Sequence, residues 1–209
     1  MSQGTSEALR ELLIACSRAD QVAALHTLGL HPGLINEHWA GNSFEVAGLD
    51  VWVNRVDTAI MVASRGGNEA LVQELVTRGA RLHARSEEDG RDALMWASWN
   101  GHTAVVAVLL NHGADPNTRN QDQTALGLAA ARDYLPICLL LVARAADLYA
   151  VNADGSGRTA LEGYGHTAEP RLSARVKRRR REALNVAYDE GPHPNSRWSQ
   201  TLSGLVART

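Results

Sequence analysis

One pattern recurs along this chain at a nearly constant spacing. It is found in Thr58-Ala-Ile-Met-Val-Ala-Ser-Arg, Asp92-Ala-Leu-Met-Trp-Ala-Ser-Trp, Thr124-Ala-Leu-Gly-Leu-Ala-Ala-Ala and Thr159-Ala-Leu-Glu, whose starts lie 34, 32 and 35 residues apart. A second shared element follows the first three starts by 21 residues, as Gly79-Ala-Arg-Leu, Gly113-Ala-Asp-Pro-Asn and Ala145-Ala-Asp-Leu. Two elements that recur at one internal offset indicate stacked units, each of which buries its apolar face only against a neighbour.

Each unit is predicted to contain two short helices. Thr58, Asp92 and Thr124 precede the first helix, and their side-chain oxygens suit the N-cap position, where a free backbone N–H needs an acceptor. The second helix of the middle unit carries an apolar stripe that must pack against the next unit, made of Val105, Val106, Leu109 and Leu110. Gly79 and Gly113 can then adopt the left-handed conformation that ends a helix.

The units resemble the ankyrin repeat, whose pattern of about 33 residues combines a T-P-L-H-x-A start, a G-H between helices and a G-A-D turn. The middle unit matches best, with Gly90, Asp92-Ala-Leu-Met-Trp-Ala97, Gly101-His102, Val105-Val106, Leu109-Leu110 and Gly113-Ala114-Asp115-Pro116-Asn117. The resemblance implies an all-α ankyrin solenoid of helix-turn-helix units joined by short β-turns or hairpins, with atypical capping units at both ends.

On this basis the chain divides into five segments. Residues 1–38 are predicted to form a capping pair of helices, at 7–16 and 21–28. Residues 39–53 are predicted to hold an inserted hairpin, because apolar side chains alternate around Ala47-Gly48. Three ankyrin repeats follow over 54–153 (54–87, 88–119 and 120–153). A degenerate fourth repeat with a basic helix is predicted over 154–190, and a C-terminal tail over 191–209.

Composition and motifs exclude several classes of function. The longest apolar runs are seven residues, 104–110 and 137–143, far below the roughly 20 that span a bilayer. The first residues lack the basic start and apolar segment of a secretory signal, so a cytoplasmic protein is expected.

Cys16 and Cys138 are too few and too far apart for a disulfide framework and are expected to be buried. The eight histidines form no metal-ligand pattern. We expect no metal, no cofactor and no catalytic residues.

Binding is the function that the resemblance implies, through the concave surface of the stack to a protein partner. In ankyrin proteins the contact positions lie in the turn before the first helix and at the end of that helix. In this sequence those positions are Asn54, Arg55, Asp57, Arg65, Glu88, Asp89, Arg91, Trp99, Asn100, Gln121, Gln123 and Arg132. Trp99 fits either an interface anchor or a side chain packed internally. Trp96 occupies a position that the family fills with an apolar residue and is expected to belong to the scaffold.

Charge is distributed unevenly. Residues 171–209 carry nine Lys and Arg against three Asp and Glu, a net charge of +6, which leaves −8 for residues 1–170. The run Lys177, Arg178, Arg179, Arg180 and Arg181 is a candidate second contact for an acidic partner. The run also fits a nuclear-import signal, a phosphate-contacting patch for nucleic acid or a solvated helix end. Nucleic acid is not expected as the main partner, because the rest of the chain is acidic and no aromatic residues interleave with the arginines.

The predicted role is that of a non-catalytic adaptor or scaffold, as a monomer or as one subunit of a hetero-complex. Two alternatives stay open. The chain could be a structural subunit of a large assembly, which would bury residues 39–53 and the tail. It could also be a regulator or inhibitor that neutralises another protein.

Overall fold

The computed structural model describes residues 3–46, 52–54, 56–120 and 123–150, together with the single positions 159, 182, 185, 186 and 189. Within this part of the chain the elements are α1 (Gln3–Ser17), α2 (Gln21–Leu30), the 3-10 helix η1 (Pro32–Asn36), β1 (Phe44–Glu45), β2 (Trp52–Val53), α3 (Ala59–Gly66), α4 (Glu69–Thr77), α5 (Ala93–Asn100), α6 (Thr103–Asn111), α7 (Ala125–Ala131) and α8 (Leu135–Val142).

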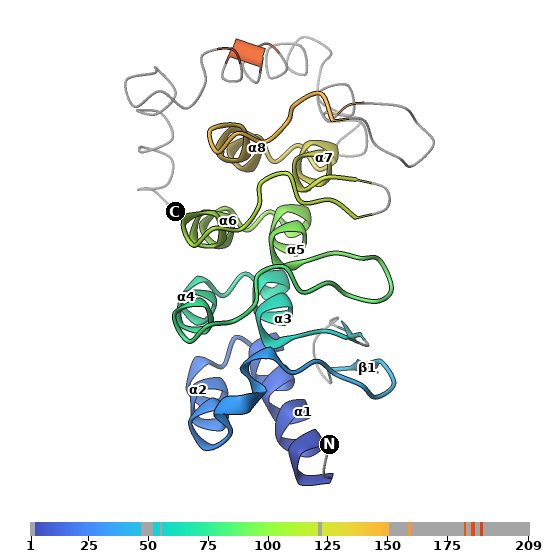
Figure 1. The fold of residues 1–209 in the computed structure, drawn as a ribbon, viewed down its shortest axis with the longest axis vertical. Helices are drawn as coiled ribbons and strands as arrows, with labels where there is room; N and C mark the ends of the chain where they lie inside the picture. The colour runs from blue at the N-terminus through green and yellow to red at the C-terminus, as the bar shows by residue number, and fades with distance from the viewer. Residues whose placement is uncertain are drawn as a thin grey trace.

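The helices form two parallel columns (Figure 1). The inner column contains α1, α3, α5 and α7, each of which packs against the next. The outer column contains α2, α4, α6 and α8, and each of these packs against the inner helix that precedes it in the chain. The turns before α5 and α7 project away from the outer column, on the far side of the inner helices. The predicted all-α solenoid of stacked helix pairs is therefore confirmed.

Burial explains why neither helix of a unit is stable alone. In α5 every residue from 93 to 98 is buried, and in α7 every residue from 125 to 130. A helix with apolar residues on all its faces needs neighbours on several sides. Helices α3 and α5 each pack against the inner helix before them, the inner helix after them and the outer helix of their own unit. Each fully buried Leu or Ile contributes roughly 1.5–3 kcal/mol relative to an exposed one. The stack is thus one continuous core rather than a row of separate ones.

The helix ends follow the predicted chemistry with one exception. The side chains of Asp92 and Thr124 accept hydrogen bonds from backbone N–H groups three residues on, at 2.9 and 3.0 Å. Gly79 and Gly113 have φ angles of +87° and +88°, as expected for glycines that end a helix. Thr58 has the same extended backbone, but its side chain makes no capping hydrogen bond, so that prediction is wrong for the first unit.

The N-terminal helix pair is longer than predicted. Helix α1 covers Gln3–Ser17 where the sequence suggested 7–16, and α2 covers Gln21–Leu30 where it suggested 21–28. The Asp20 side chain caps α2 by accepting from the backbone N–H of Ala23 at 3.0 Å. Because α1 packs on α3 as α3 packs on α5, this pair continues the stack.

A two-stranded antiparallel ribbon lies between the N-terminal pair and α3. Strands β1 and β2 pair with Phe44 opposite Val53 and Glu45 opposite Trp52. At the base, the backbone N–H of Trp39 donates to the carbonyl of Asp57 at 3.0 Å, and the carbonyl of Trp39 accepts from the N–H of Val56 at 2.8 Å. The ribbon falls within residues 39–53, where the alternation of apolar residues predicts a hairpin.

The predicted fourth repeat at 154–190, the basic run at 177–181 and the tail at 191–209 lie outside the described residues, apart from single positions. In the part of the chain that is described, no helix is long and apolar enough to cross a membrane.

Candidate functional site

The turn before α5 is built to hold one arginine in place. The backbone N–H of Ser86 donates to the carbonyl of Arg91 at 2.9 Å and closes the turn. The Asp89 carboxylate accepts from the Ser86 hydroxyl and, at 3.1 Å, from the backbone N–H of Arg91. Its second oxygen lies 3.4 Å from Nε of Arg91. These contacts fix the direction in which the Arg91 side chain leaves the turn.

Three arginines and two tryptophans alternate along the ends of the inner helices. The guanidinium carbon of Arg65 lies 4.9 Å from the ring centre of Trp96, and that of Arg91 lies 4.9 Å from the same ring. Arg91 also lies 4.7 Å from the Trp99 ring, and Arg132 lies 3.8 Å from it. All four distances fall within the range of a cation–π interaction. We call these five residues the arginine–tryptophan ladder; it connects α3, α5 and the end of α7.

The spacing within α5 explains how both indoles reach this face. Trp96 and Trp99 are three residues apart, so their side chains lie on the same side of the helix. The arginines come from the end of α3, the turn before α5 and the end of α7, which are positions that the sequence predicts for partner contacts. The ladder therefore lies on the side of the stack that corresponds to the predicted concave surface.

Two of the three arginines are paired with acidic groups. Nη2 of Arg65 lies 3.2 Å from Oδ2 of Asp57, and the Arg65 side chain is only 12% exposed. Arg91 is paired with Asp89 and is 17% exposed. Arg132 is exposed, and within the described residues no carboxylate lies in ion-pair range of it. The positive charges of Arg65 and Arg91 are thus compensated by carboxylates, whereas that of Arg132 has no such compensation within the described residues.

Asp57 is buried and cannot be a contact residue, so this candidate is corrected. Its Oδ2 accepts from the backbone N–H of Asn54 at 2.9 Å as well as from Arg65. Burial raises the pKa of the Asp57 carboxyl, and the nearby positive charge of Arg65 offsets part of that rise. Asp57 instead orients Arg65 against Trp96.

The remaining candidates divide by exposure. Glu88 is exposed at the tip of the turn, and Asn100 is exposed and donates to the Trp96 carbonyl at 2.9 Å. Gln123 is half-buried, and its backbone N–H donates to the Asn120 side chain at 2.7 Å. Arg55, Gln121 and the basic run at 177–181 lie outside the described residues.

Trp99 is packed internally, which is one of the two roles that the sequence left open; its contact with a partner stays a prediction. Its ring is half-buried and packs against the core. The guanidinium groups of Arg91 and Arg132 also lie over its ring.

Trp96 is the residue whose place in this face the sequence did not indicate. It is 9% exposed, as expected of the scaffold, yet two guanidinium groups stack on its ring. Its indole Nε1 is buried without a hydrogen-bond partner among the described residues. The spacing of Trp96 and Trp99 along a helix, with arginines in the flanking turns, is the signal that could have revealed the ladder.

The Asn120 side chain, at a position that the ankyrin resemblance assigns to partner contacts, donates to the Asp89 carbonyl at 2.8 Å and ties successive turns together. Because it holds the turn that carries Arg91, it supports the ladder without being part of it.

Histidines and cysteines have structural surroundings. Nε2 of His102 lies 3.0 Å from the Arg65 carbonyl oxygen, and Nδ1 of His112 lies 2.8 Å from that of Val108. Since a carbonyl only accepts, these nitrogens carry the ring hydrogens. Burial raises the pKa of the Cys16 thiol to about 12 and also raises the pKa of Cys138, so neither is a ready nucleophile. Among the described residues, no group of three or more His, Cys, Asp or Glu side chains could hold a metal ion.

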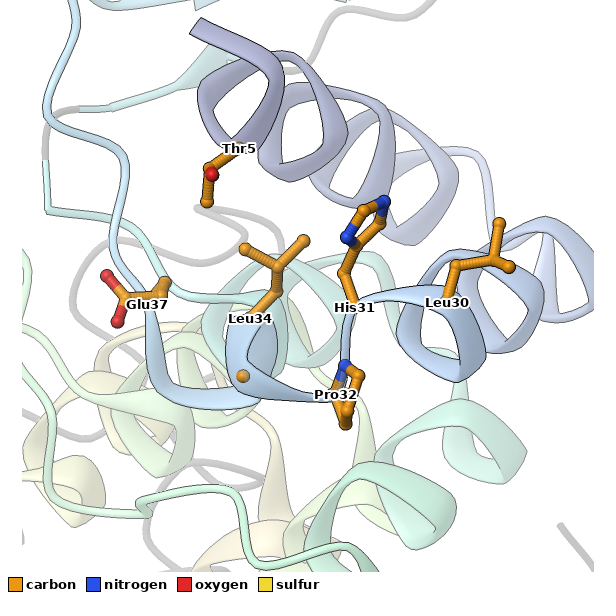
Figure 2. Close-up of a pocket in the computed structure, with 7 residues that line it drawn as sticks. Thr5, Leu30, His31, Pro32, Leu34 and Glu37 are labelled. Atoms are coloured by element: carbon orange, nitrogen blue, oxygen red, sulfur yellow. The ribbon is translucent and has the colours of Figure 1, made fainter. Parts of the chain in front are cut away.

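A separate pocket of about 400 Å³ lies at the N-terminal end of the stack (Figure 2). It is lined by residues at the start of α1 and around η1, namely Thr5, Leu30, His31, Pro32, Gly33, Leu34 and Glu37. None of the sequence-predicted contact residues lines it. The ladder and this pocket are therefore distinct features.

A stack of helix pairs with projecting turns and a ladder of side chains along its inner helices defines a repeat protein of the solenoid class. A model of the ankyrin repeat family, described as three copies of the repeat, matches residues 2–120. This match covers more than half of the chain, and the chain belongs to the ankyrin repeat family. The matched range includes the N-terminal helix pair, whereas α7 and α8 lie beyond it.

One curated relative adds to this assignment. An ankyrin repeat-containing protein of Treponema pallidum (strain Nichols) is 37% identical to this chain over 84 residues, which are 39% of this chain. The matched region spans 28% of the relative's length.

Proposed function

We propose that this chain is a non-catalytic adaptor that binds a protein partner along the arginine–tryptophan ladder. The observation that carries the proposal is the ladder itself, which brings together side chains from three successive units, with Trp99 half-buried and Arg132 exposed. Tryptophan and arginine are the residues most enriched in binding hot spots, because they offer large contact areas and directed hydrogen bonds. A repeat stack supplies the extended rigid surface on which such side chains can act together.

The local structure favours a preorganised surface. Arg65 and Arg91 are held by carboxylates and by indole faces, so little side-chain freedom would be lost when a partner binds. The turn that carries Arg91 is tied to the next turn by Asn120. Such a surface suits a folded or extended segment that contacts several units at once.

The test compares partner capture by two variants of the whole chain. In Arg91→Ala/Trp99→Ala the ladder is cut at its centre. In the control, Glu74→Ala/Arg78→Ala, an exposed ion pair of 2.7 Å on the outer helix α4 is removed. Exposed pairs of this kind contribute about 0–1 kcal/mol, so the control should fold and bind normally.

We expect proteins captured from a native extract by the parent chain to be lost with the ladder variant and retained with the control. The affinity of the purified partner for the ladder variant should fall at least about 100-fold, as for two hot-spot residues. Helical content should be unchanged in both variants. Unchanged affinity, or loss only together with unfolding, would show that the ladder is not the binding surface.

The basic run at 177–181 is proposed as a second contact for the partner. Changing Arg178–Arg181 to Gln should lower both the affinity and its dependence on salt concentration, because exposed charges are screened by salt. No change in either quantity would assign the run to a solvated surface.

A further inference from the structure

The last arginine of the ladder has a different environment from the other two. Arg132 caps the C-terminal end of α7 and lies 3.8 Å from the Trp99 ring centre. The side chains of Arg65 and Arg91 are mostly buried and paired with Asp57 and Asp89. Arg132 is exposed, and its contact with Trp99 is its one side-chain interaction within the described residues. Its hydrogen-bonding capacity is therefore directed to solvent.

This arrangement suits the recognition of a carboxylate. A guanidinium group that lies on an aromatic ring keeps its N–H groups free at the edge, where two parallel hydrogen bonds to one carboxylate can form. The indole covers the apolar face of the group and excludes water from it. Lysine could not do the same, because an ammonium group has no planar edge.

The charge of the ladder favours a carboxylate over a phosphate. Its three arginines are opposed by Asp57 and Asp89, which leaves a formal charge of +1. One aspartate or glutamate of a partner balances that charge, whereas a phosphorylated side chain brings about −1.5 to −2 at neutral pH.

We infer that the partner presents a single aspartate or glutamate side chain to Arg132, above the ring of Trp99. This inference rests on the proposed function, since it specifies the chemistry of the segment that the ladder binds. Residues 1–170 carry a net charge of −8, so a uniformly acidic segment would be repelled. The segment that fits has one carboxylate flanked by neutral or basic residues.

A random-peptide display library, selected against the purified whole chain, provides the test. Selected peptides are synthesised together with versions in which each acidic residue is changed to its amide. Their affinities are measured for the parent chain, for Arg132→Gln and for Arg81→Gln. Arg81 is exposed, follows the outer helix α4 and is not part of the ladder, so its variant controls for the loss of one positive charge.

We expect the selected peptides to share one acidic position. Its change to the amide, or the change Arg132→Gln, should each weaken binding about 10- to 100-fold, as for a charge-assisted hydrogen-bonded pair. The two changes together should weaken binding little more than either alone, because both remove the same contact. Arg81→Gln should bind as the parent does, and both variants should be fully folded at the temperature of the binding measurement.

Three outcomes would overturn the inference. Peptides that need Arg91 and Trp99 but no acidic residue would refute the carboxylate contact and leave the proposed function standing. Peptides in which phosphoserine binds more than about tenfold tighter than glutamate would refute the choice of a single carboxylate. Selection of no peptide that depends on the ladder would refute both this inference and the proposed function.

Discussion

The imidazole ring of His102 lies directly over Gly67 of the preceding unit. A Cβ atom placed on Gly67 would lie 2.5 Å from the His102 ring. The next unit repeats the arrangement, because a Cβ on Gly101 would lie 2.7 Å from the Tyr134 ring. Gly67 and Gly101 also have φ angles of +77° and +84°. In both units, the glycine in the turn between the two helices thus packs against an aromatic ring from the corresponding turn of the next unit.

This packing predicts that Gly67→Ala is strongly destabilising. The alanine would incur about 1–2 kcal/mol for the left-handed backbone and roughly 1–3 kcal/mol for displacing the His102 ring. We expect the free energy of unfolding to fall by about 2–5 kcal/mol, measured by urea denaturation.

Gly79→Ala is the matched control for this effect. Gly79 has φ +87°, and a Cβ atom placed on it would have no atom within 4 Å, so only the backbone cost of about 1–2 kcal/mol applies. Equal losses in the two variants would contradict the proposed contact between units.

Asparagine side chains link the loops of successive units in two places. The Asn36 side chain donates to the Gly79 carbonyl at 3.1 Å and accepts from the Arg81 N–H at 2.7 Å. Asn117 makes the same pair of bonds, with Ala145 at 3.1 Å and Asp147 at 2.7 Å. The corresponding position of the intervening unit holds His83, which is exposed.

His83→Asn should therefore stabilise the protein. The new amide can hydrogen-bond to the Gly113 carbonyl and the Asp115 N–H. These two groups correspond to the carbonyl and N–H groups that the Asn36 and Asn117 side chains bond. Two exposed hydrogen bonds should add about 1 kcal/mol to the free energy of unfolding. His83→Gln, whose longer side chain does not match the geometry, is the control. If His83→Asn were no more stable than the parent, the loop around residue 83 would differ in geometry from the loops around Asn36 and Asn117.

The sequence predicted the helices of the middle units well, because each is marked locally. Asp92 and Thr124 are N-caps, Gly101 and Gly113 end helices, and the apolar residues between them repeat with helical spacing. The contacts within the ladder could not be predicted from such local signals. Stacking of Arg132 on Trp99 depends on how one unit is placed on the next, which no single segment encodes. Burial of Asp57 likewise follows from its pairing with Arg65 across the unit.

The pH dependence of stability should carry a contribution from Asp92. Burial raises the pKa of its carboxyl, and hydrogen bonds from Thr118 and from the N–H of Met95 offset part of the rise, as do the charges of Arg85 and His83. A carboxyl whose pKa is higher in the folded state binds its proton more tightly there. Its contribution to stability is therefore greatest below the unfolded-state pKa of about 3.9 and is lost as the pH rises through the folded-state pKa.

In Asp92→Asn this loss should disappear, since the amide does not ionise. The stability of the variant relative to the parent should increase as the pH is raised from about 3.5 towards neutrality, in urea denaturation at a series of pH values. The Asn side chain can still accept from Met95. A relative stability that stays constant or decreases over that range would contradict the burial of an ionised carboxylate.

Arg132 and Trp99 should be coupled energetically in the free protein. Their separation of 3.8 Å predicts a coupling of about 1 kcal/mol in a double-mutant cycle with Arg132→Gln and Trp99→Leu, measured by denaturant unfolding. The pair Arg81→Gln and Trp99→Leu should be additive, because Arg81 does not contact the ring. If both cycles were additive, the stacked geometry would not persist in solution.

Amide hydrogen exchange of the whole chain, with and without its captured partner, tests most directly where the partner binds. Binding along the ladder predicts slower exchange in the turn at 86–91 and at the C-terminal ends of α3, α5 and α7, with little change in α2, α4 and α6. Slower exchange confined to the outer helices, or to the N-terminal pocket around η1, would contradict binding along the ladder.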